Sequence, residues 1–238
     1  MRTFGIVGKS LTHSFSAQYF KEKFLKEGIT NTEYLNLELE NISEFKGLIK
    51  KHKFAGLNIT IPYKKSILPF LDEISKEAKI IGAVNTIRFN NDKLIGYNTD
   101  YIGFLYSIQP LLEGRDKALI LGDGGAARAI KYALTKLGVK YKTVNRNTAF
   151  DYLDIKRETT SYYTIIINTT PQGTFPEISG YPKIPYEYLN KDNLLFDLIY
   201  NPYETKFLAY GKAKDAQTKN GLEMLQIQAE ESWRIWNL

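Results

Sequence analysis

Two segments of the chain carry polar side chains whose types and spacing suit proton transfer. Residues 58–64 read Asn-Ile-Thr-Ile-Pro-Tyr-Lys, which places Asn58, Thr60 and Lys64 around the end of an expected strand. Asp100 ends a Gly-Tyr-Asn-Thr-Asp run and stands just inside an expected helix. A partly buried lysine can act as a general acid or base. Taken alone, Lys64 is also consistent with a solvated charge, and Asp100 with a carboxylate that stabilises a helix dipole.

Two serines near the N-terminus could seat a carboxylate. Ser14 and Ser16 flank Phe15 where a helix is expected to begin, so their hydroxyls would lie beside backbone N–H groups that have no helical partner. The plainer interpretation is that one serine only caps the helix. A carboxamide follows at Asn85, within a Gly-Ala-Val-Asn-Thr run.

A glycine turn in the second half of the chain has the pattern of a dinucleotide-binding site. The run Gly-Asp-Gly-Gly-Ala-Ala at 122–127 follows an apolar strand and opens a helix, which is the context in which G-x-G-x-x-A is informative. Gly122 permits the tight turn, Gly124 lets the backbone approach a pyrophosphate, and the helix N-terminus faces the phosphates. Asp123 would repel them unless its carboxylate points away.

The end of the next strand indicates which dinucleotide is bound. An NAD site carries an acidic residue there, which accepts hydrogen bonds from the ribose hydroxyls. This chain has Asn145 and Arg146 instead. A guanidinium pairs strongly with phosphate, so the sequence predicts the 2′-phosphate of NADP at this point. The alternative is that Arg146 is a solvated surface residue.

The apolar pattern predicts the elements that must position these side chains. Short β-type runs alternate with helical stretches in a βαβαβ start, which a helical pair over about 62–81 and a hairpin then follow. A helix over about 99–113 leads into a second series of βα units. That series begins with the apolar strand 118–121, and its strands are spaced as a doubly wound parallel sheet requires.

We therefore expect an α/β fold of two domains. Residues 1–100 form an N-terminal α/β substrate-binding domain, which a C-terminal helix at 222–238 completes. Residues 101–221 form an NADP-binding, Rossmann-type domain with a doubly wound parallel sheet.

Composition excludes several classes of protein. Apolar residues make up 43% and charged residues 24% of the 238 positions, which is an ordinary balance for a folded globular chain. The chain has no cysteine and only two histidines, so we expect no disulfide, no thiolate nucleophile and no metal site. There is no membrane-length apolar run and no secretory signal, which predicts a cytoplasmic protein. The net charge of +6 is scattered, which does not favour nucleic acid as a partner.

The polar clusters, taken in order, resemble the shikimate dehydrogenase family over nearly the whole chain. Besides the serines and the glycine turn, the matching segments are 58–64, 82–86, 98–100, 145–146, 168–171, 197–200 and 221–225 with Gln228. The resemblance implies reversible, NADPH-dependent reduction of 3-dehydroshikimate to shikimate in the biosynthesis of chorismate and the aromatic amino acids. The implied partner is this small-molecule substrate, and we expect a monomer or a homodimer.

The resemblance also implies a role for each matching residue. It gives Lys64 and Asp100 the catalytic roles at the reacting oxygen. Substrate contacts are implied for Ser14, Ser16, Asn58, Thr60, Asn85, Tyr200 and Gln228. Contacts with NADP are implied for Gly122, Gly124, Gly125, Ala126, Asn145, Arg146, Asn168, Thr169, Leu198 and Gly221.

Two other functions stay open at this point. A quinate/shikimate dehydrogenase with a broader substrate range or with NAD as cofactor shares the fold and most of the motifs, and Arg146 counts against NAD. A non-catalytic NADP-binding protein would be expected to have lost Lys64 or Asp100, and both are present.

Overall fold

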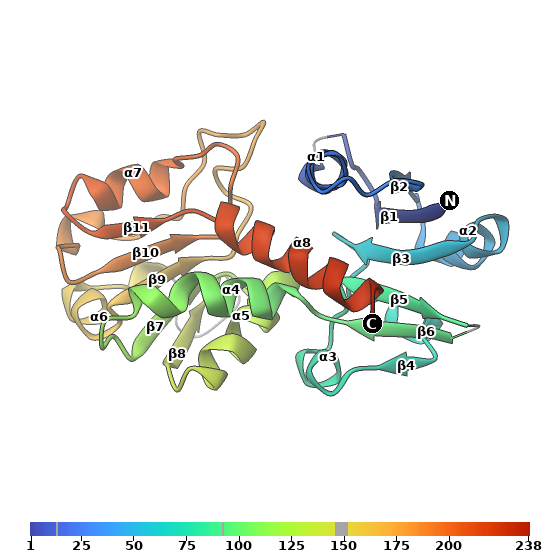
Figure 1. The fold of residues 1–238 in the computed structure, drawn as a ribbon. Coiled ribbons are helices and arrows are strands. Elements are labelled where there is room, and N and C mark those ends of the chain that lie inside the picture. Colours follow the sequence, from blue (N-terminus) through green and yellow to red (C-terminus); the bar gives the residue numbers. More distant parts are fainter. Residues whose placement is uncertain (13, 92, 146–151) are drawn as a thin grey trace. The chain divides into compact units, whose positions relative to one another are not determined.

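Two β-sheets, one in each of two units, organise the chain in the computed structural model (Figure 1). The structure describes residues 1–12, 14–91, 93–145 and 152–238. The first unit comprises Met1–Thr99 and Ala229–Leu238, and the second comprises Asp100–Gln228. The chain returns to the first unit between Gln228 and Ala229, inside the last helix. The boundary expected from the sequence lies before that helix, after residue 221.

The first unit is built on a six-stranded sheet in the order β2-β1-β3-β5-β6-β4. Its strands are β1 (Arg2–Gly8), β2 (Thr32–Glu38), β3 (Phe54–Ile59), β4 (Glu73–Ile74), β5 (Thr86–Asn90) and β6 (Lys93–Tyr97). β1 pairs in parallel with β2 and β3, β5 runs antiparallel to β3 and β6, and β4 is parallel to β6. The expected βαβαβ start and the hairpin are confirmed.

Helices cover both faces of this sheet. They are α1 (Phe15–Lys26), α2 (Phe45–Lys51), α3 (Lys76–Ile81) and the last turns of α8 (Leu222–Trp236), with 3₁₀ turns η1 (Ile42–Glu44) and η2 (Leu68–Phe70). The helical pair expected over 62–81 is wrong in its first half, where the described helical turn is η2 alone. Pro69 lies in η2 and lacks the N–H that a longer helix needs. The Asp72 carboxylate instead accepts the Leu94 N–H at 2.8 Å, next to the pairing of β4 with β6.

Aromatic packing fixes the end of α8 on the first sheet. Phe4 of β1 packs on Trp236 with ring centroids 4.9 Å apart. Gly56 of β3 makes room for this indole, because a Cβ built on Gly56 would overlap the ring. The indole N–H donates to the Ile87 carbonyl at 3.0 Å. The last turns of α8 thus complete the core of the N-terminal part of the chain.

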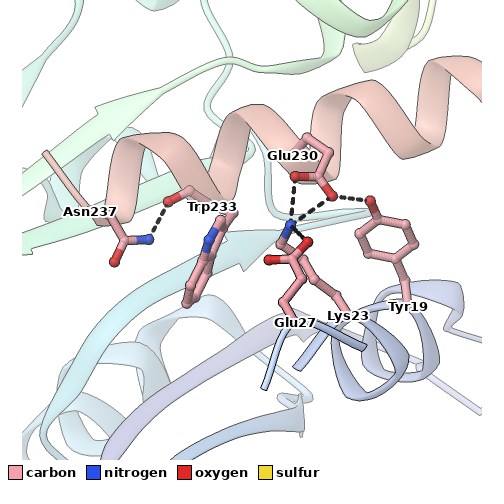
Figure 2. Close-up of polar contacts among 6 residues, drawn as sticks. All are labelled: Tyr19, Lys23, Glu27, Glu230, Trp233 and Asn237. Carbon is pink, nitrogen blue, oxygen red and sulfur yellow. Dashed lines mark hydrogen bonds and ion pairs between the residues drawn. The ribbon is translucent and has the colours of Figure 1, made fainter. Parts of the chain in front are cut away.

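A buried ammonium joins α1 to α8 within the first unit (Figure 2). Lys23 Nζ of α1 lies 2.8 Å from Glu230 Oε2 of α8 and 2.7 Å from Glu27 Oε1. Tyr19 also donates its hydroxyl to Glu230. Burial opposes the charge, but the bonds to Glu230 and Glu27 outweigh it and raise the pKa of Lys23. The Lys23 side chain is 7% exposed and that of Glu230 is 48% exposed, so the ammonium is the desolvated partner.

The second unit is built on a five-stranded parallel sheet in the order β11-β10-β9-β7-β8. Its strands are β7 (Lys117–Leu121), β8 (Lys140–Val144), β9 (Ile165–Asn168), β10 (Leu194–Asp197) and β11 (Gln217–Lys219). The unit also holds the first turns of α8 and, in chain order, α4 (Asp100–Ile108), η3 (Gln109–Leu111), α5 (Gly125–Lys136), η4 (Tyr152–Asp154), α6 (Arg157–Tyr162), η5 (Tyr186–Tyr188) and α7 (Lys206–Lys212).

The parallel sheet is doubly wound, as predicted. The strand order reverses between β7 and β9, and Figure 1 shows helices on both of its faces. Phe104 of α4 and Ile130 of α5 pack in one cluster, and Phe207 of α7 packs in another. The helix expected over 99–113 is shorter, because α4 ends at Ile108 and Pro110 follows in η3. None of the described helices has the length and apolar character needed to cross a bilayer.

Replacing Glu230 by Gln should lower the free energy of unfolding by about 1 to 2 kcal/mol, because Lys23 stays buried and loses a charged partner. Glu22→Gln is the matched control on α1, since Glu22 is exposed and bonds Gln18. The control should change the unfolding free energy by less than about 0.5 kcal/mol. Urea unfolding measures both variants, and equal small losses would show that the cluster around Lys23 contributes nothing.

Candidate functional site

The N-terminus of α1 holds a hydroxyl that no protein group satisfies. Ser14 is the N-cap residue of α1, yet its side chain makes no capping hydrogen bond. Within the described part of the chain, Ser14 Oγ is the one buried side-chain polar atom without a hydrogen-bond partner. The first turn of α1 carries no acidic residue, so its N–H groups and dipole favour an anion. This arrangement suits a carboxylate and departs from the capping interpretation.

Ser16 is buried in the first turn of α1, and a polar network is buried in the same unit. In this network Tyr34 Oη donates to Asn58 Oδ1 at 2.7 Å. Asn58 Nδ2 then donates to Ser232 Oγ of α8 at 3.0 Å. Asn58, a predicted substrate contact, is 5% exposed and has both ends of its carboxamide engaged in this network.

The same network extends to the end of β6. Ser232 Oγ lies 2.8 Å from Thr86 Oγ1 and 3.2 Å from Thr99 Oγ1. Asn85 Nδ2 donates to Thr99 Oγ1 at 2.9 Å, and Asn85 Oδ1 accepts the Thr99 N–H at 2.7 Å. The predicted site residue Asn85 thus holds the residue that immediately precedes Asp100.

Backbone hydrogen bonds place Lys64 on the neighbouring segment. The Lys64 carbonyl accepts the Val84 N–H at 2.8 Å, directly before Asn85. Lys64 itself is half-buried, and Thr60 is half-buried where β3 has ended. Asp100 is the first residue of α4 and is 7% exposed. The segment that carries Lys64 is therefore bonded to the segment that holds the strand end before Asp100.

Four members of the network are absent from the predicted site residues: Tyr34, Thr86, Thr99 and Ser232. Thr86 and Thr99 at least lie in the matching segments 82–86 and 98–100, whereas Tyr34 and Ser232 lie outside all of them. Ser232 lies on α8 between the buried residues Ala229 and Trp236, so a serine on an apolar helix stripe was the available signal. Tyr34 belongs to a strand of mixed polarity, where nothing local separates a hydrogen-bonded phenol from an ordinary ring.

The glycine turn after β7 has the geometry that phosphate binding needs. Gly122 has a φ of +101°, and a Cβ built there would lie 2.9 Å from both Thr169 Oγ1 and Thr170 Cγ2. Cβ atoms built on Gly124 and Gly125 would have no neighbour within 4 Å, so that side of the turn is open. α5 begins there without a side-chain cap or an acidic first turn. These residues fit a dinucleotide pyrophosphate at the N-terminus of α5.

Asp123 is compatible with such a phosphate site. Its carboxylate pairs with the Lys131 ammonium of α5. The ion pair offsets the negative charge that would otherwise repel a phosphate at the turn.

A buried carboxylate joins the loops that follow β9 and β10. Asp197 Oδ1 accepts from Asn168 Nδ2 at 3.0 Å and from the Ile199 N–H at 3.1 Å. Asp197 Oδ2 accepts the Thr205 hydroxyl at 2.6 Å. Burial raises the pKa of Asp197 to about 6, although these three hydrogen bonds act in the opposite direction. The Asn168 side chain, a predicted NADP contact, therefore helps to shape these loops.

Three further predicted NADP residues lie on the same strand-end loops. Thr169 Oγ1 donates to the Leu121 carbonyl at 2.8 Å. The Gly221 N–H donates to the Ile199 carbonyl at 3.0 Å, and a Cβ built on Gly221 would overlap the Leu198 carbonyl. These loops follow the carboxyl ends of parallel strands, where doubly wound sheets bind their ligands.

The remaining predicted residues, apart from Arg146, are at least partly shielded from solvent. Ala126 and Asn145 are half-buried, while Arg146 lies outside the described residues. Tyr200 is half-buried after β10, and Gln228 Nε2 donates to a backbone carbonyl of α8 at 3.0 Å. Across the described ranges, no three His, Cys, Asp or Glu side chains gather as metal ligands would.

A relative of known activity matches nearly the whole chain. The shikimate dehydrogenase (NADP(+)) of Carboxydothermus hydrogenoformans is 39% identical to it, over 98% of this chain and 90% of the relative. The chain belongs to the shikimate dehydrogenase family. Residues 6–87, within the first unit, match the family described as the shikimate dehydrogenase substrate binding domain.

Solved structures of this family share the fold. The shikimate 5-dehydrogenase of Thermus thermophilus, solved in complex with NADP(H) and shikimate, gives a TM-score of 0.87 at 31% identity, covering 99% of this chain and 93% of that one. A quinate dehydrogenase from Corynebacterium glutamicum, solved in complex with NAD, gives a TM-score of 0.89 at 27% identity with the same coverage. The predicted family and fold class are confirmed.

Replacing Asp197 by Asn should change how stability depends on pH. The native pKa of about 6 exceeds the ordinary 3.8, so the folded chain takes up a proton at Asp197 before the unfolded chain does as the pH falls. The wild type should therefore gain up to about 3 kcal/mol of stability relative to Asp197→Asn between pH 7 and pH 4.

Chemical denaturation at several pH values measures this difference. Asp192→Asn is the control, because Asp192 is exposed near the start of the same strand. A wild-type-minus-variant difference that stayed flat from pH 7 to pH 4 would contradict the raised pKa of Asp197.

Proposed function

We propose that this chain is an NADP-dependent shikimate dehydrogenase that reversibly reduces 3-dehydroshikimate to shikimate, a step toward the aromatic amino acids. Membership of the family supplies the activity. The structural observation that carries the proposal is the buried, unpartnered hydroxyl of Ser14 at an anion-favouring helix N-terminus. A carboxylate substrate would satisfy both the hydroxyl and the helix dipole.

The first unit is the substrate-binding part in this proposal. Ser14 and Ser16 take the carboxylate at the N-terminus of α1, and Thr60 and Asn85 take hydroxyl groups. Asn58 acts by holding the network together, because its carboxamide is engaged with Tyr34 and Ser232. Tyr200 and Gln228 of the second unit are assigned to the substrate on the family resemblance.

The second unit is the NADP-binding part. The open turn at Gly124 and Gly125 would hold the pyrophosphate against α5, with Gly122 and Ala126 shaping the turn. The other assigned contacts are Asn145, Arg146, Asn168, Thr169, Leu198 and Gly221. When bound, the cofactor supplies or accepts the hydride of the reaction.

Lys64 and Asp100 handle the proton in this proposal. The Lys64 ammonium stabilises negative charge on the substrate oxygen and donates the proton that makes it a hydroxyl. Asp100 orients that ammonium as its carboxylate partner. In the reverse direction the Lys64 amine accepts the proton of the substrate hydroxyl and becomes the ammonium again. A cytoplasmic location and a monomeric or homodimeric state complete the proposal.

Quinate and NAD form the second candidate pair, because a quinate dehydrogenase bound to NAD shares the fold. Absorbance at 340 nm with purified protein, crossing NADP and NAD against shikimate and quinate, separates the two. We expect the highest kcat/KM for NADP with shikimate. Preference for NAD with quinate would replace the proposed activity by the second one.

Lys64→Ala and Asp100→Ala should each lower kcat by about a hundredfold or more, as expected for a lost general acid or its partner. The double variant should be little worse than the worse single variant, because the two side chains act as a unit. Lys65→Ala is the control, since Lys65 is the exposed neighbour. Effects that multiply in the double variant would refute the coupling, and a near-normal kcat in Lys64→Ala would remove the proton donor.

Arg146→Ala should weaken NADP binding about tenfold to hundredfold, because one charge-assisted contact with the 2′-phosphate is lost. NAD carries no such phosphate, so its affinity should change much less. Lys140→Ala tests the general loss of one positive charge, since Lys140 is exposed at the start of β8. Titration of both cofactors measures the effect, and an equal loss for NADP and NAD would exclude Arg146 from the phosphate contact.

A further inference from the structure

We propose that Lys131 is a determinant of cofactor specificity, because its ion pair with Asp123 keeps that carboxylate from repelling the 2′-phosphate of NADP. Lys131 is a positioning residue in this role, since it acts on the cofactor through Asp123. The inference rests on the proposed function, because it concerns which dinucleotide the second unit binds. It adds two side chains that the proposed NADP site does not include.

Asp123 lies at the edge of the sheet where both phosphate positions of NADP are proposed. It belongs to the turn after β7, whose open side at residues 124–125 is assigned to the pyrophosphate. Directly before Asp123, the Gly122 N–H donates to the Val144 carbonyl at 2.8 Å. Val144 ends β8, and the segment 145–146, which is assigned to the adenosine end of NADP, follows it. Asp123 is therefore a neighbour of both proposed phosphate positions.

An uncompensated carboxylate at this edge would select against NADP. Neighbouring strands lie about 4.8 Å apart, and charges interact over about 10 Å at 0.1 M salt, so a charge after β7 acts on a phosphate after β8. NADP carries a phosphate that NAD lacks, so the same carboxylate would weaken the binding of NADP more than that of NAD. NAD sites of this fold likewise carry an acidic residue near the ribose hydroxyls.

The ammonium of Lys131 compensates this charge. Residues 125–131 span about 9 Å along the axis of α5. Side chains of a helix lean toward its N-terminus, so the Lys131 ammonium reaches back to the turn and pairs with Asp123. The Lys131 side chain is 25% exposed and that of Asp123 is 50% exposed, so water screens the pair only in part. The first turn of α5 has no acidic residue, which leaves Asp123 as the negative charge that Lys131 must offset.

Titration of the protein with NADPH and NADH, followed by cofactor fluorescence without substrate, tests the inference. Lys131→Met should weaken NADPH binding about threefold to tenfold more than NADH binding, because the Asp123 carboxylate is then uncompensated. In an Asp123→Asn background, the same change should alter the preference by less than about twofold. Lys136→Met removes an equal charge from the exposed last turn of α5 and should leave the preference unchanged.

Salt separates this electrostatic effect from damage to the turn. Raising the salt concentration from about 0.05 M to about 0.5 M should reduce the effect of Lys131→Met, because screening shortens the range of the repulsion. An effect that did not respond to salt would overturn the inference. Ion pairs with this exposure contribute little to stability, so the variants should fold.

Two other results would overturn the inference and leave the proposed function standing in a wild type that turns over shikimate with NADP. One is a loss in Lys131→Met that is the same with and without the Asp123 carboxylate, which would make Lys131 a direct contact of the cofactor. The other is an equal weakening of NADPH and NADH. A wild type that binds NADPH no more tightly than NADH would remove the proposed NADP site, and this inference with it.

Discussion

The hydrogen bond from Asn58 to Ser232 joins residues 174 positions apart, and the first unit is organised around it. Asn58 lies on the central strand β3, and Ser232 lies on α8, the last helix of the chain. A buried amide must find partners for both of its ends, so its orientation is fixed by what surrounds it. Tyr34, which donates to Asn58, stacks its ring on Phe20 of α1, and Ser232 contacts Thr99, the residue before α4. The side chain of Asn58 is thus bonded into a network that contacts α1, β3 and α8.

In the second unit a buried carboxylate, and not an amide, joins segments that are distant in the sequence. Asp197 holds the loops after β9 and β10 through three hydrogen bonds, in a sheet whose strand order reverses beside the glycine turn. A carboxylate accepts in several directions at once, which suits the joining of backbone and side-chain donors. Because burial raises the pKa of Asp197 to about 6, the stability of this part of the chain depends on pH. The network around Asn58, as the described residues form it, contains no carboxylate and lacks this dependence.

Much of the architecture could be predicted from local patterns. Strands that are buried on both faces appear in the sequence as continuous apolar runs. The glycine turn adds a motif whose glycines are needed for close approach to a phosphate, so the doubly wound sheet could be predicted. The two-residue strand β4 was not, because its formation depends on pairing with β6 more than on its own residues. Ser14 shows the limit most clearly. A serine that caps a helix and a serine whose hydroxyl has no protein partner can have the same local sequence. Only the structure around the hydroxyl distinguishes the two cases.

The division of α8 has a consequence for the order in which the protein is made. Residues 100–228 form the second unit without interruption, so this unit has all its residues once Gln228 leaves the ribosome. The first 99 residues are made earlier but lack Ser232 and Trp236, and without them Asn58 has no helix partner and the space over Gly56 is unfilled. The part of the chain that is synthesised first therefore completes its core only after all the residues of the second unit have been made.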